Sequence, residues 1–315
     1  MKSIAVTIGD PAGIGAEIIA KTLLERDFVE QYPFTVVAPK FVLDDAFESI
    51  LKTGRTDPAP TVEELPYDIT PFPIKYGVCS AECGKIAMQA VEHAVKLTMA
   101  GRFDAIVTAP INKHAIAMAG YNYAGHTEYL EALTGGKDVA MMLASDKVRV
   151  ILVTTHLPIK DIPEQITHEK VLSAIRSADR AGRLFGIDHP RIAVCGLNPH
   201  AGDNGTLGDE EITTIIPAIK QAVNEGINAT GVHSADALYA HCDSFDISVA
   251  MYHDQGLIPV KMGGSDNVVN ITLNLPIIRT SVGHGTAFDI AGKGIANNNS
   301  LKNAIIAAHR IANNV

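Results

Sequence analysis

Residues 4–24 read IAVTIGDPAGIGAEIIAKTLL, and this stretch sets a pattern that recurs along the chain. The apolar run 4–8 is typical of a buried strand, and Gly15–Leu24 has the composition of a helix. The glycines between them, at positions 9, 13 and 15, match neither the dinucleotide fingerprint G-x-G-x-x-G nor a Walker A loop. We interpret residues 9–15 as a tight strand-to-helix turn, with Asp10 as a candidate ligand residue.

The same alternation of short apolar runs and longer helical patterns continues to the end of the chain. Further strand patterns cover residues 34–38, 105–108, 148–154, 191–195, 247–251 and 268–273. Helix patterns cover residues 82–100, 168–185, 209–222 and 301–313. Strands that alternate with helices predict an α/β fold with a largely parallel sheet covered on both faces. The segment 56–73, rich in Pro and Asp, is expected to be a surface excursion.

Composition narrows the class of protein. The chain has 315 residues, 47% of them hydrophobic, which favours two domains over one. A formal net charge of -9 argues against nonspecific binding to nucleic acid or to an anionic membrane. No apolar run approaches a membrane span, and the N-terminal run is too short for a signal peptide. We therefore expect a cytoplasmic protein whose four cysteines are reduced and packed.

Three of the twelve histidines follow strand patterns. His156 comes after ILVTT, His200 after IAVCG and a short turn, and His253 after ISVAMY. Ligands of open parallel sheets bind at the carboxyl ends of the strands, so these rings are expected at a common edge. Three imidazoles suit a divalent transition metal and leave a coordination position open for substrate. Structural or acid–base roles for the same histidines remain alternatives.

Two other segments have the chemistry of an anion site. Lys261, Asn270 and Arg279 lie in a stretch so apolar that site roles are favoured over surface roles. His126 and Thr127 precede an apolar helical run, where Thr127 is expected either to cap the helix or to bind an anion at its N-terminus. The segment 283–287, GHGTA, is expected to open a helix with little side-chain bulk beside a ligand.

Seven ordered motifs carry a resemblance that spans essentially the whole chain. They are GDPAGIG, VTAPINK at 107–113, GHTE at 125–128, TTHLP at 154–158, GLNPHAG at 196–202, YHDQGL at 252–257 and NITLNLPIIRTSVGHGTAFDIAGKG at 270–294. Together they resemble the 4-hydroxythreonine-4-phosphate dehydrogenase family of vitamin B6 (pyridoxine) biosynthesis. The resemblance implies an isocitrate/isopropylmalate dehydrogenase-like fold, with two interleaved α/β domains and a cleft between them. The expected domains are 1–125 with 275–315, and 126–274.

The resemblance also implies roles for individual residues. His156, His200 and His253 match metal ligands, one divalent cation per site, with Zn, Co, Ni, Mn or Mg all open. Substrate binding is implied for His126, Thr127, Lys261, Asn270 and Arg279, and a catalytic role for Asp236, Asp254 and Lys261. HGTA resembles an adenosine-binding segment, which implies NAD, or alternatively NADP, bound at His284, Gly285, Ala287 and Asp289. A homodimer whose subunits share active sites is expected, with the 126–274 domain at its interface.

The implied reaction is oxidation of the C3 hydroxyl of 4-phosphohydroxy-L-threonine to a 3-keto acid, followed by decarboxylation. Gly283 stands where many members of the family have Asp. The segment between Asp236 and His253 is also slightly shorter than in the biosynthetic enzyme. Both differences leave the identity of the substrate undecided. D-threonate 4-phosphate, D-erythronate 4-phosphate and aromatic cis-dihydrodiols are alternatives. Two rivals from other classes are a phosphate acyltransferase-like enzyme and a metal-dependent hydrolase. Neither requires NAD, so formation of NADH distinguishes them from a dehydrogenase.

Overall fold

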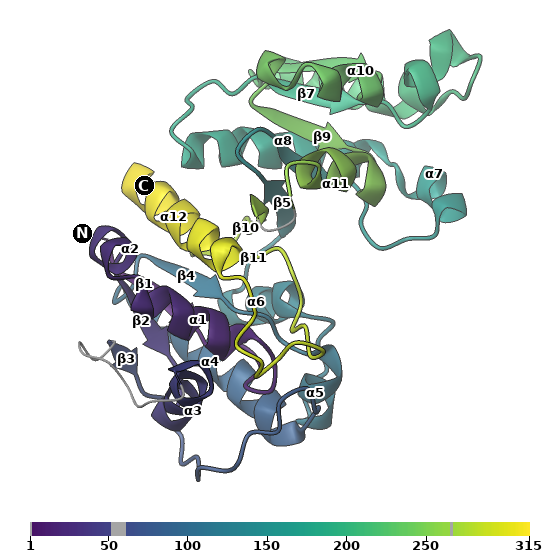
Figure 1. The fold of residues 1–315 in the computed structure, drawn as a ribbon. Helices are drawn as coiled ribbons and strands as arrows, with labels where there is room; N and C mark the ends of the chain where they lie inside the picture. Colours follow the sequence, from purple (N-terminus) through teal and green to yellow (C-terminus); the bar gives the residue numbers. More distant parts are fainter. Residues whose placement is uncertain (1, 52–60, 265–266) are drawn as a thin grey trace. The chain divides into compact units, whose positions relative to one another are not determined.

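The computed structural model describes residues 2–51, 61–264 and 267–315, which form two compact units. Unit 1 comprises Met1–Val139 and Leu275–Asn313, and unit 2 comprises Ala140–Asn274 with Asn314–Val315. In Figure 1, unit 1 therefore combines purple and blue segments with yellow ones from the other end of the chain. The chain passes from unit 1 into unit 2 after Val139 and returns at Leu275 to complete unit 1.

Unit 1 is built on a sheet in which all described strand pairs are parallel. Its order is β3-β2-β1-β4-β11, with bounds Val62–Glu63, Phe34–Val37, Ile4–Thr7, Ala105–Thr108 and Ile278–Val282. Every residue of β1 and β4 is buried, as expected for central strands covered on both faces. Thr7 pairs with Thr108, and Thr108 pairs with Ser281, so three hydroxyl side chains share one face at the carboxyl end of this sheet.

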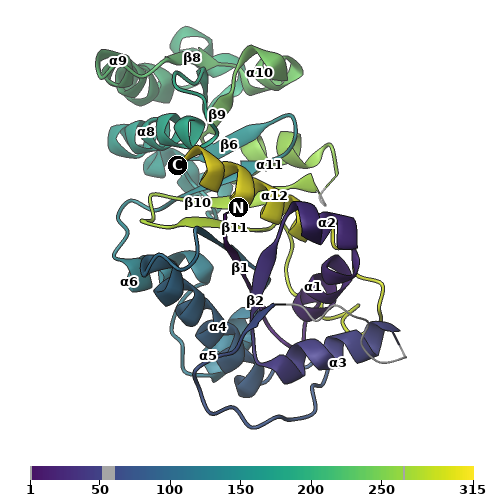
Figure 2. The same cartoon turned by 90° about the vertical axis from the view of Figure 1, so that its left-hand side faces the viewer.

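Helices cover both faces of the unit 1 sheet. They are α1 Gly15–Leu24, α2 Arg26–Gln31, α3 Lys40–Leu51, α4 Ala81–Met99, α5 Lys113–Met118, α6 His126–Thr134 and α12 Asn299–Asn314. Figure 2 shows α4, α5 and α6 on one side of the sheet and α1, α2 and α3 on the other. α4 begins where the Ser80 hydroxyl accepts a hydrogen bond from the Cys83 amide, a standard N-cap.

The glycines between β1 and α1 are required by close packing. Gly9 has a φ of +70°, and a Cβ added there would lie 2.5 Å from the carbonyl oxygen of Pro110. A Cβ at Gly15 would lie 2.5 Å from the carbonyl oxygen of Ile8. Both distances are shorter than any tolerable contact, so only glycine permits this turn. The prediction of a tight strand-to-helix connection is confirmed.

Unit 2 has a mixed sheet in the order β10-β5-β6-β9-β7-β8. The bounds are Val269–Leu273, Ala140–Ala144, Arg149–Leu152, Ile247–Ala250, Ile192–Cys195 and Ala229–His233. β5 is antiparallel to both β10 and β6, whereas β6, β9, β7 and β8 pair in parallel. The carboxyl ends of these four parallel strands therefore lie at one edge of the sheet.

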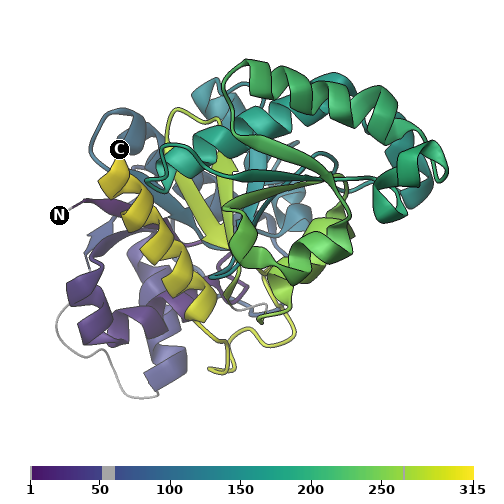
Figure 3. The same ribbon diagram turned by 90° about the horizontal axis from the view of Figure 1, so that it is seen from above.

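The α-helices of unit 2 are α7 Ile162–Gln165, α8 His168–Leu184, α9 Ile216–Asn224, α10 Ala235–Ala240 and α11 His253–Lys261. Short 3-10 segments are η1 Ile159–Asp161, η2 Pro199–Gly205 and η4 Cys242–Ser244, and η3 Glu211–Ile215 is a π-helical turn. In Figure 3, the teal α8 and green α9 run along one side of the strands and the yellow-green α11 along the other.

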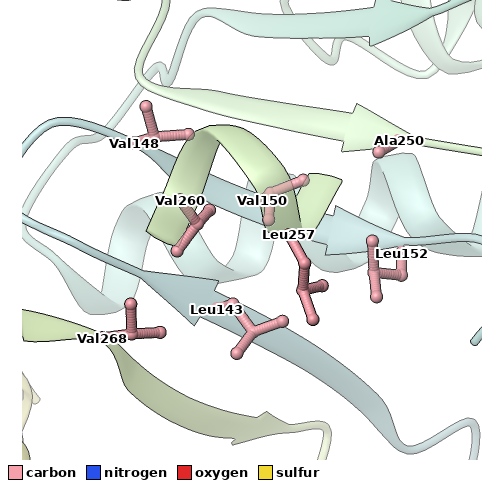
Figure 4. Packing of buried hydrophobic residues seen from close by; sticks show 8 residues of the cluster. All are labelled: Leu143, Val148, Val150, Leu152, Ala250, Leu257, Val260 and Val268. Carbon is pink, nitrogen blue, oxygen red and sulfur yellow. The ribbon is translucent and has the colours of Figure 1, made fainter. Parts of the chain in front are cut away.

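One hydrophobic cluster attaches α11 to the sheet. Figure 4 shows Leu257 and Val260 of α11 against side chains of neighbouring strands, namely Leu143, Val148, Val150, Leu152, Ala250 and Val268. Burying each large aliphatic side chain contributes about 1.5–3 kcal/mol, so this packing fixes the helix that begins at His253.

Three sequence expectations need correction. Residues 126–139, which we assigned to the second domain, belong to unit 1, where α6 packs against α4. The helix pattern at 209–222 is a π-turn followed by α9. The 283–287 segment opens no helix: residues 288–294 form turns, because Gly292 and Gly294 adopt φ values of +71° and +69°, and the next helix is α12. Within the expected surface excursion, residues 56–60 lie outside the described residues, and 62–63 form β3.

Candidate active site

Two of the three predicted metal histidines lie together in unit 2. The ring centroids of His156 and His253 are 5.7 Å apart, with their planes inclined by 43°. Residues that follow β6 are held to residues that follow β9: the Thr154 amide donates to the Met251 carbonyl at 3.1 Å, and the Thr154 hydroxyl donates to it at 2.7 Å. Because these two parallel strands are neighbours, their carboxyl ends carry both imidazoles to one place.

His253 has a carboxylate partner on one ring nitrogen. Its Nδ1 lies 2.7 Å from Oδ1 of Asp254, and both residues are in the first turn of α11. A carboxylate on Nδ1 favours the proton there and leaves Nε2 with its lone pair, which is the form of histidine that binds a metal. His156 and His253 can therefore contribute two of the three or four ligands that a divalent cation needs.

His200 lies in a different setting within unit 2. It is exposed, near the start of η2, and its φ of +52° lies in the left-handed region. The hydrogen bond from the Ser234 hydroxyl is the largest cause of a lowered pKa for Asp236, in the first turn of α10, and His200 is close enough to contribute a smaller lowering. Among residues 2–51, 61–264 and 267–315 of one chain, no group of three or more His, Cys, Asp or Glu side chains is placed to hold a metal.

The predicted substrate residues of unit 2 lie on two elements. Lys261 is exposed at the last position of α11, about 12 Å along the helix axis from His253 at 1.5 Å per residue. Asn270 is on β10, and its Oδ1 atom is buried without a hydrogen-bond partner. A buried amide oxygen without a partner is costly, so this atom is a candidate contact for a donor on a ligand.

Unit 1 holds a buried guanidinium. Arg279, on β11, is 3% exposed, and its Nε and Nη2 atoms donate to the hydroxyl of Thr108 at 3.2 and 2.7 Å. Burial lowers the pKa of Arg279 to about 9. A buried cation is stabilised by a bound anion, and the planar guanidinium matches the geometry of phosphate or carboxylate. Thr108 was not among the predicted site residues, although it ends a strand at the edge where ligands bind.

His126 is placed beside this cation. Its Nε2 atom is buried and has no hydrogen-bond partner. Burial lowers the pKa of His126 well below its ordinary value, and the positive charge of Arg279 lowers it further, so the ring is neutral at pH 7. α6 begins at His126 with Gly125 as its N-cap and no side-chain cap, so the expectation that Thr127 caps the helix is wrong. The free amides at this N-terminus instead suit an anion.

The HGTA segment, also in unit 1, packs against the glycine turn at the start of the chain. The Ile14 amide donates to the Thr286 carbonyl at 3.0 Å, and a Cβ added to Gly13 would lie 2.9 Å from that oxygen. His284 Nε2 is buried without a partner, while a Cβ at Gly285 would meet no atom within 4 Å. Ala287 has a φ of +43° and Asp289 is exposed. An unpartnered ring nitrogen beside an open glycine fits a cofactor with hydrogen-bonding groups.

Asp10, the candidate ligand residue of the glycine turn, is fully buried. Its Oδ1 accepts the Ala12 amide at 2.9 Å, while Oδ2 is buried without a hydrogen-bond partner. Burial raises the pKa of Asp10 to about 6.

Across the described residues, no helix has both the length and the apolar character to cross a bilayer.

Comparison with known proteins shows which family this chain resembles. The model of the family described as "Pyridoxal phosphate biosynthetic protein PdxA" matches residues 30–308. A 4-hydroxythreonine-4-phosphate dehydrogenase from Beijerinckia indica is 45% identical over 98% of this chain and 94% of its own. A D-threonate 4-phosphate dehydrogenase from Pectobacterium atrosepticum is 40% identical over 99% of both chains.

Solved structures agree with the fold. The crystal structure of 4-hydroxythreonine-4-phosphate dehydrogenase from Klebsiella pneumoniae superposes with a TM-score of 0.88 and 39% identity, covering 99% of this chain and 100% of the other. A β-decarboxylating dehydrogenase from Thermococcus kodakarensis, at 17% identity and a TM-score of 0.51, covers 98% of this chain and 82% of its own and shares the fold alone. The expected isocitrate/isopropylmalate dehydrogenase type of fold is confirmed. The chain belongs to the PdxA family, a family of dehydrogenases.

Proposed function

We propose that this PdxA-family member is a divalent-metal- and NAD-dependent dehydrogenase acting on a phosphorylated hydroxy acid. The reaction is oxidation of the C3 hydroxyl of 4-phosphohydroxy-L-threonine to a 3-keto acid, which then loses CO2. The proposal is carried by the pair of imidazoles at 5.7 Å, one of them paired with a carboxylate. The names of the curated relatives support the dehydrogenase class and the phosphorylated substrate.

His156, His200 and His253 would hold the cation, which can be Zn, Co, Ni, Mn or Mg. When bound, a divalent cation acidifies an alcohol and polarises a carbonyl. Asp254 orients His253 through Nδ1, and Asp254 and Asp236 are exposed carboxylates that can accept the hydroxyl proton.

A homodimer is part of this proposal, because no group of three candidate ligands forms within the described residues of one chain. Leu157 and Ile159, which follow His156, are 40% and 80% exposed and offer an apolar surface to a second subunit.

Each unit, taken by itself, offers partners for an anionic group. In unit 1, Arg279, His126 and Thr127 would bind the phosphate, with the N-terminal amides of α6 as further donors. In unit 2, Lys261 would neutralise a carboxylate, and Asn270 would accept a hydrogen bond from a hydroxyl or amine. The neutral ring of His126 would bind the phosphate without adding a second buried positive charge beside Arg279.

His284, Gly285, Ala287 and Asp289 would bind NAD, which accepts the hydride. The unpartnered His284 Nε2 can exchange a hydrogen bond with the nucleotide, and Gly285 leaves space for its approach. NADP is the alternative cofactor.

Chelation followed by add-back tests the catalytic metal. Metal-free enzyme should form no NADH from 4-phosphohydroxy-L-threonine, and activity should return when Zn, Co or Mn is added. Replacing His253 by Ala should lower kcat by orders of magnitude while thermal stability changes little, because the ring is partly exposed. Undiminished turnover by the metal-free enzyme would contradict the proposal.

D-threonate 4-phosphate is a second candidate substrate, favoured by the relative from Pectobacterium atrosepticum, which matches along essentially the whole chain. Both substrates have a phosphate, and they differ at C2, where one has an amine and the other a hydroxyl. A panel of the two compounds with D-erythronate 4-phosphate and a cis-dihydrodiol, compared by kcat/KM with NAD, identifies the substrate. The dihydrodiol should be the poorest substrate, because it has no phosphate for the guanidinium of Arg279 to bind.

A further inference from the structure

The side chain of Gln255 joins the two segments that carry His200 and His253. Its Oε1 accepts a hydrogen bond from the Met251 amide at 2.6 Å, and its Nε2 donates to the Gly196 carbonyl at 2.7 Å. Met251 follows β9, two residues before His253, and Gly196 follows β7, four residues before His200. Because β7 and β9 are adjacent parallel strands, one amide group links their carboxyl ends just where the histidine segments begin.

A buried carboxylate holds the His200 segment from its other side. Glu211 is 1% exposed, and its Oε1 accepts the amides of Leu197 and Asn198 at 2.8 and 2.7 Å. Its Oε2 accepts Asn198 Nδ2 at 3.0 Å. A Cβ added to Gly202 would lie 2.6 Å from the same oxygen, so the loop packs directly against this carboxylate. Hydrogen bonds to a charged acceptor are stronger than neutral ones, which makes Glu211 an effective anchor.

The His200 segment depends on such anchors, because its backbone is intrinsically unfavourable. Residues 200–204 have φ values of +52°, +52°, +79°, +42° and +55°, and four of the five are not glycine. The left-handed region is unfavourable for residues other than glycine, so surrounding contacts must impose this conformation. The hydrogen bonds that Glu211 and Gln255 make with the His200 segment reach residues 196–198, just before the strained run.

We propose that Gln255 and Glu211 are positioning residues that fix the backbone of the loop that presents His200 for metal binding, an inference that rests on the proposed metal-dependent function. Gln255 fixes the base of the loop to the strand end that leads into α11, and Glu211 fixes the turn that presents His200. Neither residue touches the cation; each acts through the backbone of the histidine segments. Sequence patterns did not single out either one.

Co2+ titration of metal-free protein tests this directly, because its visible absorption reports both affinity and coordination geometry. Gln255→Met removes both hydrogen bonds at similar length, and Glu211→Gln replaces an acceptor of two amides by a weaker, uncharged one. Loss of partners of this kind typically weakens metal binding by about 10- to 100-fold. We expect weakening in that range for both variants, together with an altered Co2+ spectrum and, in the metal-free protein, faster hydrogen exchange of residues 196–205.

Matched controls come from the same unit. Gln221→Met changes an exposed glutamine of α9 that donates to Glu225, and Glu225→Gln changes an exposed glutamate, just after α9, that pairs with Arg176. Both controls should bind Co2+ as the wild type does. If Glu211→Gln fails to fold, Gln255→Met and Gln255→Glu, which keeps the acceptor and loses the donor to Gly196, still decide the matter.

The outcomes distinguish failure of the positioning role from failure of the proposed metal dependence. Wild type that binds Co2+ while His200→Ala does not, with Gln255→Met and Glu211→Gln matching the wild type in affinity and spectrum, would overturn the positioning role and leave the metal proposal intact. Wild type that binds no Co2+ would overturn both. Weakened binding in the Gln255 and Glu211 variants, with unchanged controls, supports the inference.

Discussion

The guanidinium of Arg279 rests on the hydroxyl of Thr108, which accepts two of its hydrogen bonds at 2.7 and 3.2 Å on the neighbouring strand. Both residues are almost fully buried. Thr108→Val keeps the shape of the side chain but removes the acceptor. An unsatisfied buried donor costs about 1–3 kcal/mol, so we expect the free energy of unfolding to fall by that amount in chemical denaturation. Thr108→Ser, which keeps the hydroxyl, should lose much less.

Arg279 itself should decide whether a phosphate is recognised. Arg279→Met removes the charge and the planar donor set. Hydrogen bonds to charged groups contribute about 1.5–3 kcal/mol, so KM for the phosphorylated substrate should rise roughly 10- to 150-fold. Inorganic phosphate should compete with the substrate in the wild type and should do so far more weakly in the variant. If the variant is still inhibited by phosphate at the wild-type concentration, the anion site lies elsewhere.

Replacing Asp10 by Asn should stabilise the protein by an amount that depends on pH. Burial raises its pKa from 3.8 to about 6, so its contribution to stability is fully present below pH 3.8 and is lost as pH rises through 6. The shift corresponds to about 3 kcal/mol at 1.36 kcal/mol per unit of pKa. Asp10→Asn has no carboxylate to ionise, yet its Oδ1 can still accept the Ala12 amide.

The variant should therefore be more stable than wild type by up to about 3 kcal/mol at pH 8, with the difference vanishing near pH 4. Urea unfolding at a series of pH values measures it. A difference independent of pH would show that Asp10 does not titrate in this range.

Alanine variants of Gly13 and Gly285 test whether the HGTA segment affects NAD binding through its packing or through direct contact with the cofactor. A Cβ at Gly13 meets the backbone oxygen of Thr286 at 2.9 Å, so Gly13→Ala should displace the HGTA segment, lower the melting temperature and raise KM for NAD. A Cβ at Gly285 meets nothing within 4 Å, so Gly285→Ala should leave stability within about 0.5 kcal/mol of wild type. It should still raise KM for NAD if the cofactor approaches there. Equal KM values in wild type and Gly285→Ala would remove Gly285 from the cofactor site.

Local patterns predicted those parts of the fold that depend on neighbours in sequence. The first strand, its glycine turn and α1 follow from apolar runs and from backbone positions that only glycine can occupy. The placement of His156 near His253 follows from the rule that parallel strands end at one edge. The first prediction needs only neighbouring residues, whereas the second also requires β6 and β9 to be adjacent strands.

Long-range contacts account for what the sequence did not predict. Nothing near Glu211 in the sequence indicates that its carboxylate reaches back to Leu197 and Asn198, which lie 14 and 13 residues earlier. Thr108 was missed because its partner, Arg279, lies 171 residues away. The expected helix after HGTA is absent because Gly292 and Gly294 take left-handed conformations, a choice set by packing such as that of Tyr76 against Gly292.

The division of the chain into units has a consequence for synthesis. Nearly all of unit 2, Ala140–Asn274, is one continuous segment, whereas unit 1 needs β11 and α12 from Leu275–Asn313. A ribosome therefore releases the body of the later-starting unit before the earlier-starting one has its fifth strand. We expect a truncated chain that ends at Asn274 to resist protease within 140–274 while its first 139 residues are still cut, so the unit begun first is the one finished last.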